Sequence, residues 1–264
     1  MRGERSLPAF LGLLVLLSVP FWLAGAGLGT QLLPGLPFAA LQAVCPGAAA
    51  VILIARGGGA KGLRDFLARA LRPGARAIWW LPAFLLMPLV AVLSYLIVRG
   101  PQAALPGIAP GIAPGYAGAL FAVFLAGALC EELGWSAYAL GPLQRRWSAL
   151  AAGVVLGIIW AAWHVPPLIE VHRSANWIAW WAIGTVATRV LLVWLFDNTG
   201  PGILPAAVMH ATDNLSWQLT PVNGSFFDPR IHALILVAVV ACIVAIWGPR
   251  TLRRAEKPES ASSG

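Results

Sequence analysis

Seven polar side chains lie within long apolar stretches of the sequence, and their types suit hydrolytic chemistry. They are Glu131, Glu132, His164, Arg189, His210, Asp213 and Asn214. Ionisable groups inside membrane-spanning segments are costly and are functional candidates by default. The other charged residues fall between the apolar stretches or near the chain ends. These seven residues therefore form the candidate site.

The two histidines stand at helical spacing from another polar or aromatic residue. His210 and Asn214 are four residues apart, so both project from one face of a helix. Trp160 and His164 have the same spacing, which places an indole beside that imidazole. Each histidine thus has a predicted neighbour on its own helix face.

The adjacent glutamates cannot both point at one centre without adjustment. In a helix with about 3.6 residues per turn, Glu132 is rotated about 100° from Glu131. Glu131 shares its face with Trp135. We expect one carboxylate to contact the reacting molecule and the other to support it.

Two glutamates, two histidines and an asparagine in a dry site fit two kinds of chemistry. In one, a carboxylate beside a histidine takes a proton from water, and a second histidine with an amide stabilises the oxyanion. In the other, Glu131, His164 and His210 bind catalytic zinc, with water in the fourth position. The sequence has no His-Glu-x-x-His motif, and the two histidines lie on different spans, so the residue types leave zinc possible but do not specifically indicate it. The residue types also leave open an ion relay in a transporter and purely structural hydrogen bonding.

The elements that must position these residues are membrane helices. Apolar residues make up 59% of the 264 residues and charged residues 11%, too few charges to cover a soluble protein of this length. A membrane helix needs about 20 mostly apolar residues. We assign spans to residues 7–28, 37–55, 77–98, 116–139, 149–166, 177–196, 203–218 and 231–248. The sequence therefore predicts an all-α, polytopic transmembrane helical bundle.

Positive charge sets the predicted orientation. A net charge of +8 suggests nucleic acid in a soluble protein, but these basic residues cluster between apolar stretches, so we predict the lipid bilayer and no nucleic acid as partner. The termini and the even-numbered connections carry 14 Lys and Arg residues, whereas the other connections carry 3, namely Arg99, Arg173 and Arg230. Cytoplasmic loops are enriched in Lys and Arg, so both termini are predicted to be cytoplasmic.

The remaining sequence organises into one domain. We predict a single integral-membrane domain over residues 1–254 and a disordered cytoplasmic tail over residues 255–264. Residues 61–73 are either a short amphipathic helix on the cytoplasmic leaflet or a basic loop, and the Pro- and Gly-rich residues 106–115 predict an outer loop. His172 and His232 are expected near loops and in contact with solvent.

Three segments resemble the signature of the CAAX-protease and bacteriocin-processing family, also called the Abi family of intramembrane endopeptidases. That signature is Glu-Glu-x-x-x-Arg, then an aromatic-x-x-x-His, then His-x-x-x-Asn or Asp, on successive helices. The matching segments are Glu131-Glu132-Leu133-Gly134-Trp135, Trp160-Ala161-Ala162-Trp163-His164 and His210-Ala211-Thr212-Asp213-Asn214. The resemblance covers a core of about residues 118–217.

The resemblance implies an all-helical fold with a catalytic cavity inside the membrane, and endopeptidase activity. By similarity, Glu131 and His164 would activate the water, and His210 and Asn214 would form the oxyanion hole. Glu132 would position or tune its neighbour, and this glutamate-based chemistry needs no metal. The predicted supporting residues are Trp135, Trp160, Asp213 and Arg189.

The sequence departs from the family pattern at one charged position. The signature arginine would fall at Ser136, which leaves the carboxylate pair without its nearby cation. We advance Arg189 as the substitute, because an unpaired arginine inside a membrane is expensive. The alternative is that Arg189 extends to the cytoplasmic interface. Asp213 either orients His210 or faces away from it, and the spacing does not decide.

The substrate class follows from the resemblance and the location. We expect a peptide, a prenylated C-terminus or another membrane protein as substrate. The high Ala, Gly, Pro and Arg content favours a bacterial plasma membrane. The alternative functions are a non-catalytic membrane scaffold or immunity protein and a small transporter. A transporter typically contains an internal repeat, and the sequence has no second copy of the glutamate or histidine segments.

Overall fold

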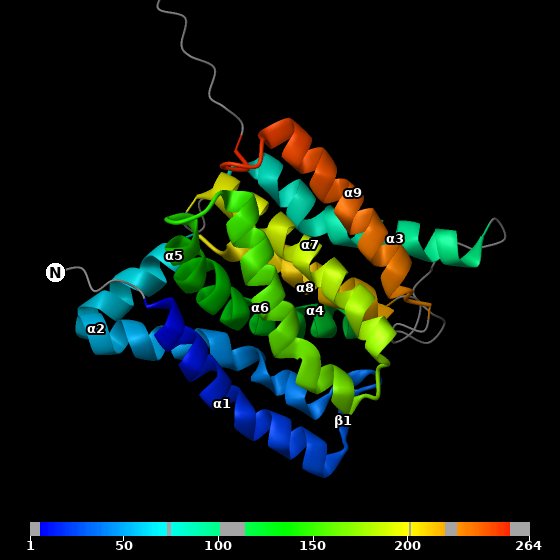
Figure 1. Ribbon diagram of the computed structural model, residues 1–264, viewed down its shortest axis with the longest axis horizontal. Helices are drawn as coiled ribbons and strands as arrows, with labels where there is room; N and C mark the ends of the chain where they lie inside the picture. Colours follow the sequence, from blue (N-terminus) through cyan, green and yellow to red (C-terminus); the bar gives the residue numbers. More distant parts are fainter. Residues whose placement is uncertain (1–5, 73–74, 101–113, 201, 220–225, 254–264) are drawn as a thin grey trace, which may run out of the picture.

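Helices form nearly all of the regular structure. The computed structural model of the chain describes residues 6–72, 75–100, 114–200, 202–219 and 226–253. The α-helices are α1 (Leu7–Leu28), α2 (Cys45–Ala70), α3 (Trp80–Arg99), α4 (Pro114–Gly134), α5 (Leu140–Gln144), α6 (Ala149–Glu170), α7 (Ala175–Thr199), α8 (Leu204–Leu219) and α9 (Pro229–Trp247). A small hairpin, β1 (Gln31–Leu33) and β2 (Leu36–Pro37), follows α1, and tighter helical turns form η1 (Phe38–Val44), η2 (Ala77–Trp79) and the π-helical η3 (Trp135–Ala139). The predicted all-α bundle is confirmed (Figure 1).

Seven of the eight predicted spans coincide with helical segments that are long and apolar enough to cross a membrane. The exception is the span predicted over residues 203–218. It corresponds to α8, which has 16 residues and a length of about 24 Å, short of the roughly 30 Å hydrocarbon core. α8 is nevertheless enclosed in the bundle, where it packs against α3, α4 and α7.

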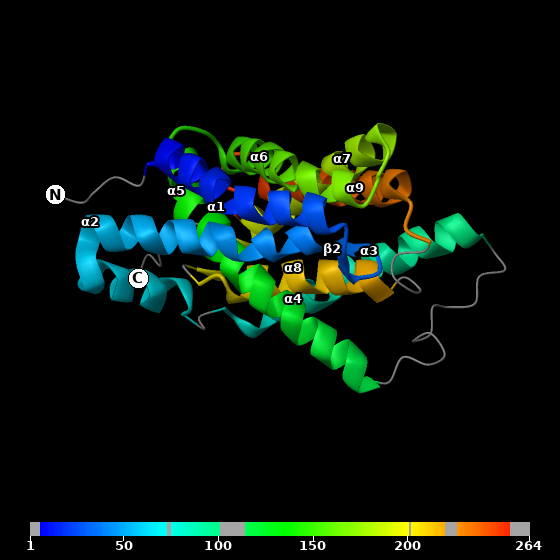
Figure 2. The ribbon, with the colours of Figure 1, turned by 90° about the horizontal axis from the view of Figure 1, so that it is seen from below.

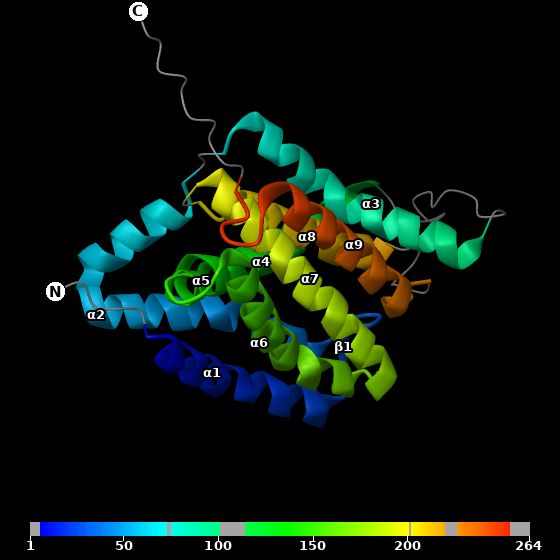
Figure 3. The same cartoon turned by 45° about the horizontal axis from the view of Figure 1, so that its top comes forward.

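The second predicted span is longer than expected. Residues 37–55 were expected to span, whereas the helical segment continues from Phe38 to Ala70. Gly59 breaks the regular helix within α2, with φ 60° and ψ −163°, so the two halves of α2 meet at a sharp angle (Figure 3). Residues 60–70 after this bend are helical. Of the two alternatives predicted for residues 61–73, a helix or a basic loop, the structure therefore shows the helix. The residues predicted as an outer loop lie mostly, and the predicted tail entirely, outside the described residues.

Short polar residues define where several helices begin. Ser6, Ser148 and Ser174 each accept a hydrogen bond from a backbone N–H in the first turn of α1, α6 and α7. Such caps satisfy N–H groups that have no partner within the helix. The start of α6 is held further by the carbonyls of Pro249 and Arg250, which accept from its first two N–H groups.

The layering of the bundle places α6 and α7 at its centre. α6 lies between α1 and α7, and α7 lies between α6 and α9 (Figure 3). α4 crosses beside α2 and α8. The helices that carry the candidate residues are therefore linked in a series, with α6 against α7, α7 against α8, and α8 against α4.

The bundle has two distinct ends. One end, called the basic end below, gathers the end of α2, the starts of α6 and α8, and the last residues of the described chain, joined by backbone hydrogen bonds from Ile203 to Ala70 and from Ala149 to Arg250. The opposite end, called the hairpin end, gathers the β1–β2 hairpin and the ends of α6 and α8, joined by hydrogen bonds from Phe38 to Glu170 and from Gln218 to Pro34. Figure 2 shows the two ends on opposite sides of the view.

Candidate active site

Two close helix contacts bring the site together. A methyl group on Gly134 would lie 2.5 Å from Cβ of Pro46, so α4 and α2 touch directly beside the glutamate pair. A methyl group on Gly157 would lie 2.9 Å from Cα of Val186, so α6 and α7 are equally close. Small residues allow helix backbones to approach in this way. The first contact fixes α4 against α2 beside the glutamates, and the second brings the candidate residues of α6 and α7 close together.

The two glutamates point in different directions, as their spacing predicts. Glu131 is 4% exposed and lines a cavity, whereas Glu132 is fully buried and lies outside that cavity lining. Glu131 accepts a hydrogen bond of 2.8 Å from Nε1 of Trp160 on α6. Its carboxylate is thus held in place with capacity left for a ligand, since a carboxylate accepts several hydrogen bonds.

Glu132 is occupied by three partners. Nη1 of Arg189 donates to both of its oxygens, at 3.0 and 2.8 Å. The hydroxyl of Ser136, one turn along, donates to Oε2, and Nδ1 of His210 lies 3.1 Å from Oε1. This carboxylate anchors its neighbours rather than facing the cavity.

Arg189 forms an ion pair with Glu132, one of the two glutamates for which the sequence suggested it as the cation. Its side chain and that of Glu132 are both fully buried, which excludes an extended arginine reaching the membrane interface. The guanidinium also lies over the ring of Trp160, 4.0 Å from the ring centroid. The cation missing at Ser136 is therefore supplied from α7, and Ser136 itself donates to the same carboxylate.

His164 and His210 come from different helices and flank Trp160, with ring centroids 5.4 and 5.1 Å from that indole. Nδ1 of His164 lies 2.9 Å from the carbonyl oxygen of Trp160. A carbonyl only accepts, so this nitrogen carries the hydrogen and Nε2 is the free acceptor of the neutral ring. In His210 the bond to Glu132 engages Nδ1 in the same way and leaves Nε2 available to a ligand.

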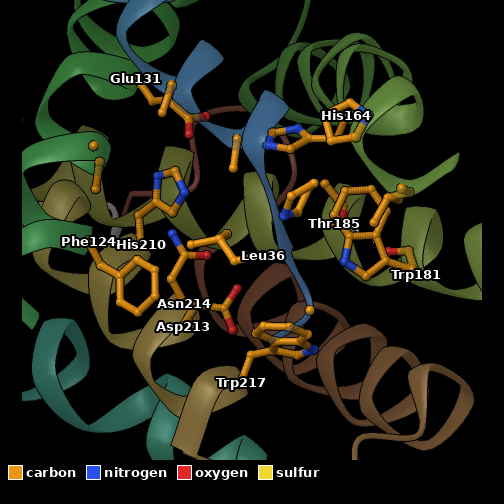
Figure 4. A pocket seen from close by; sticks show the side chains of 18 of the residues that line it. Leu36, Phe124, Glu131, His164, Trp181, Thr185, His210, Asp213, Asn214 and Trp217 are labelled. Carbon is orange, nitrogen blue, oxygen red and sulfur yellow. Dashed lines mark hydrogen bonds between the residues drawn. The ribbon is translucent and has the colours of Figure 1, made fainter. Parts of the chain in front are cut away.

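The cavity has a volume of about 390 Å³. Glu131, His164, His210 and Asn214 all line it, which brings four of the five predicted catalytic residues to one space (Figure 4). The remaining wall is mostly apolar and aromatic, with Trp181 and Trp217 among its members. Such a cavity favours an apolar ligand fixed by a few polar groups.

Asp213 and Trp135, both predicted as supporting residues, lie in different surroundings. The sequence left open whether Asp213 orients His210, and the structure places it against another histidine. Asp213 lines the cavity and lies 3.8 Å from Nε2 of His232 on α9. Trp135 does not line the cavity and packs in the core against Phe10 and Trp163, with centroids 5.6 and 5.7 Å apart.

Sequence reasoning missed the role of His232. The histidine is 7% exposed and lines the cavity, so the expectation of a solvated residue near a loop is wrong. Its position at the start of α9 suggested solvent, and only the packing of α9 against α3 and α7 buries it. His172, by contrast, is exposed, as expected.

The described side chains are not grouped as a metal site would require. Among the described residues, no group of three or more His, Cys, Asp or Glu side chains is arranged to hold a metal ion. The zinc alternative, with Glu131, His164 and His210, therefore has no ready ligand set in the described part of the chain. The predicted absence of a cofactor remains a prediction.

Comparison with known proteins agrees with this arrangement. The family model "Type II CAAX prenyl endopeptidase Rce1-like" matches residues 113–216, the segment that carries all three motifs. The chain is also similar to "CAAX prenyl protease 2" of Methanococcus maripaludis, with 29% identity over 236 residues, 82% of this chain and 80% of the relative. The segment that carries the three motifs is therefore similar to CAAX prenyl endopeptidases, and in this chain it forms helices of a polytopic bundle.

Proposed function

We propose that the chain hydrolyses a peptide bond inside the membrane, with Glu131 as general base and His164 beside it. The observation that carries the proposal is that the two glutamates differ in their hydrogen-bond partners and that only one of them lines the cavity. Glu132 is saturated by an arginine, a serine and a histidine, whereas Glu131 has a single fixed donor and lines the cavity. A base must keep lone pairs for the water that it deprotonates.

The reaction would run in two steps. Glu131, with Nε2 of His164 accepting from the same water, removes a proton as the water oxygen attacks the carbonyl carbon of the peptide. Nε2 of His210 and the amide of Asn214 donate hydrogen bonds to the resulting oxyanion. The carbon–nitrogen bond then breaks, and the proton held by Glu131 passes to the leaving amine.

Charge balance supports these roles. For His210 to donate from Nε2 while Nδ1 donates to Glu132, its ring must be the imidazolium. The site then contains two cations, Arg189 and His210, and two anions, Glu131 and Glu132. A neutral total suits a site with little water, since uncompensated buried charge is costly.

The proposed substrate is a polypeptide associated with the membrane. The archaeal relative is named a CAAX prenyl protease, and a mostly apolar cavity suits a lipid-bearing or membrane-embedded chain equally. A glutamic-type mechanism without metal is part of the same proposal.

The test compares cells that produce the native chain with cells that produce Glu131→Gln at equal membrane levels. The readout is the set of membrane peptides and new protein termini. A precursor should accumulate and its fragment disappear in Glu131→Gln, because general bases contribute about 10²–10⁴-fold to rate. Asp65→Asn, the same chemical change at an exposed carboxylate on α2, is the matched control and should behave as native. If the protein termini in Glu131→Gln cells match those in native cells, Glu131 is not the base. If both also match the termini in cells without the chain, the non-catalytic scaffold is favoured.

A further inference from the structure

A short basic helix lies at the basic end of the bundle, apart from the cavity that contains Glu131. It consists of residues 60–70, the part of α2 beyond the bend at Gly59, and together with Leu71 and Arg72 it is called the basic arm below. In Figure 1 this part of α2 runs across the direction of α1. No residue of the basic arm, all of which the structure describes, lines the cavity. The basic arm is therefore separate from the candidate active site.

The two faces of the basic arm have opposite character. At about 100° per residue, one face of the helix is formed by Leu63, Phe66, Leu67 and Ala70. Phe66 and Ala70 are each 2% exposed, and Phe66 packs in the larger hydrophobic core. The opposite face carries the exposed residues Lys61, Arg64 and Arg69. Because the apolar face is held against the bundle, the basic face points away from it.

The positive charge of the basic arm is not neutralised by neighbouring side chains. Arg72 and Arg76 extend this charge beyond the helix, and both are exposed. Asp65 is the only acidic residue in the sequence from 60 to 76. In the described part of the chain, none of the five basic side chains at positions 61, 64, 69, 72 and 76 forms an ion pair. Groups of about four to eight Lys and Arg residues on an amphipathic helix are typical of surfaces that bind anionic lipids.

Neighbouring apolar side chains place these charges at the level of the lipid headgroups. Leu71 is 44% exposed and Ile78 is 57% exposed, and they lie on either side of Arg72 in the sequence. Large apolar side chains that are this exposed are stable in contact with lipid tails rather than with water. Trp79 and Trp80 follow, and tryptophan is enriched where lipid tails meet headgroups. The anion nearest to the basic arm is therefore a membrane lipid rather than a solute in bulk water.

The end of the basic arm is joined to the start of α8. The carbonyl oxygen of Ala70 accepts a hydrogen bond of 2.7 Å from the backbone N–H of Ile203, which is fully buried directly before α8 begins. A methyl group on Gly202 would lie 2.1 Å from the carbonyl oxygen of Arg72, so the two segments touch. The position of the basic arm therefore bears on the helix that presents His210 to the cavity.

We propose that the basic face of the arm binds the headgroups of anionic phospholipids, and that bound lipid holds the arm against the start of α8. A phosphodiester headgroup supplies the negative charge that the five basic side chains lack in the described part of the chain. Arginine suits this role because its planar guanidinium can donate two parallel hydrogen bonds to phosphate oxygens. The site does not depend on the proposed function, since lipid binding requires no peptide substrate.

The test measures lipid binding to the purified full chain in neutral maltoside micelles. Dioleoyl phosphatidylglycerol or dioleoyl phosphatidylcholine is added, and thermal unfolding is followed by tryptophan fluorescence. Lipid that binds the folded chain raises the unfolding midpoint as its concentration increases. We expect phosphatidylglycerol to reach half of its effect at a concentration at least about tenfold lower than phosphatidylcholine, since each basic residue near an anionic surface strengthens binding about fivefold. In about 1 M salt, where charges are screened beyond about 3 Å, the difference should disappear.

Two quadruple variants locate the site. The arm variant removes four charges from the basic arm, as Lys61→Gln, Arg64→Gln, Arg69→Gln and Arg72→Gln. The matched control removes four exposed charges elsewhere at the basic end, as Arg145→Gln, Arg146→Gln, Arg250→Gln and Arg253→Gln. The arm variant should lose the preference for phosphatidylglycerol, and the control should keep it. If the arm variant does not fold, Arg64→Gln and Arg69→Gln are made singly on the face away from the bundle, and each should weaken phosphatidylglycerol binding about fivefold.

Backbone hydrogen exchange tests the link to α8. Phosphatidylglycerol should slow exchange at Ile203 and in the first turn of α8 in the native chain and not in the arm variant. Bound phosphatidylglycerol that leaves this exchange unchanged overturns the link.

The binding site itself is overturned by equal affinity for the two lipids, or by an equal loss of preference in the arm variant and the control. Inorganic phosphate that raises the unfolding midpoint as much as phosphatidylglycerol indicates a site for soluble anions and overturns lipid as the ligand. All of these measurements give the same result in the Glu131→Gln chain whether or not it is a protease. Failure here is therefore distinct from failure of the proposed function.

Discussion

Arg189 offers the sharpest test of how the site is held together, and the perturbation is Arg189→Met. Methionine keeps the length and apolar stem of the side chain and removes the charge. The two bonds from Nη1 to Glu132, at 3.0 and 2.8 Å, and the stacking on Trp160 at 4.0 Å are lost. Glu132 keeps only the donors from Ser136 and His210.

The expected magnitude follows from burial. Both side chains of the pair are 0% exposed, so the remaining carboxylate has no water to replace the lost cation. Removing one partner of such a pair costs about 3–5 kcal/mol of folding free energy. Because two donors to Glu132 remain, we place the loss for Arg189→Met near the lower limit, at about 3 kcal/mol.

The assay is unfolding in mixed micelles titrated with SDS, followed by tryptophan fluorescence. The double variant Glu132→Gln, Arg189→Met removes both charges and keeps an oxygen to accept from His210. It should recover at least about half of the loss, since replacing a whole buried pair is often neutral. Arg146→Met at the exposed basic end is the matched control, with an expected change within about 0.5 kcal/mol. Stability of Arg189→Met within about 1 kcal/mol of native, or no recovery in the double variant, would refute the reasoning.

Three further perturbations have distinct readouts. Trp160→Phe removes the N–H that donates to Glu131 at 2.8 Å. Because hydrogen bonds to charged groups contribute about 1.5–3 kcal/mol, the variant should lower kcat about tenfold on the substrate identified from the new protein termini. An unchanged kcat would contradict this. Gly134→Ala places a methyl group 2.5 Å from Cβ of Pro46 and should destabilise the chain by about 1–3 kcal/mol in SDS titration, whereas Gly12→Ala, with no atom within 4 Å, should not; equal stability of the two argues against close packing there. Dialysis against 1,10-phenanthroline should leave the cleavage rate unchanged, and a lost rate that zinc restores would favour the metal-dependent alternative.

Much of the fold could be predicted because the bilayer restricts what a chain can do. Apolar stretches of about 20 residues must become helices in lipid, where every backbone group needs an internal partner. The bounds were less predictable. The end of the second span was misplaced because Gly59 bends α2 without ending it, so the helical segment reaches Ala70. The short α8 was counted as a span because composition does not show that neighbouring helices enclose it.

The site could be predicted in part for a similar reason. A spacing of four residues predicts that His210 shares a helix face with Asn214, and Trp160 with His164. The rotation of about 100° between adjacent residues predicts that the two glutamates point in different directions. Spacing along one helix contains no information about contacts between helices. The burial of His232 against Asp213, and the position of Trp135 in the core, depend on how α9 and α1 pack.

By itself the sequence determined the helical membrane fold, the residues proposed to carry the chemistry and the charge asymmetry between the two ends. Local geometry and lipid solvation are sufficient for these, since both act on a segment regardless of its neighbours. Only the tertiary structure decided that Arg189 pairs with Glu132, that Glu131 faces a cavity, and that this cavity lies toward the hairpin end. Those outcomes depend on close contacts between helices distant in the sequence, such as Gly157 against Val186, and packing at that scale is a property of the assembled bundle.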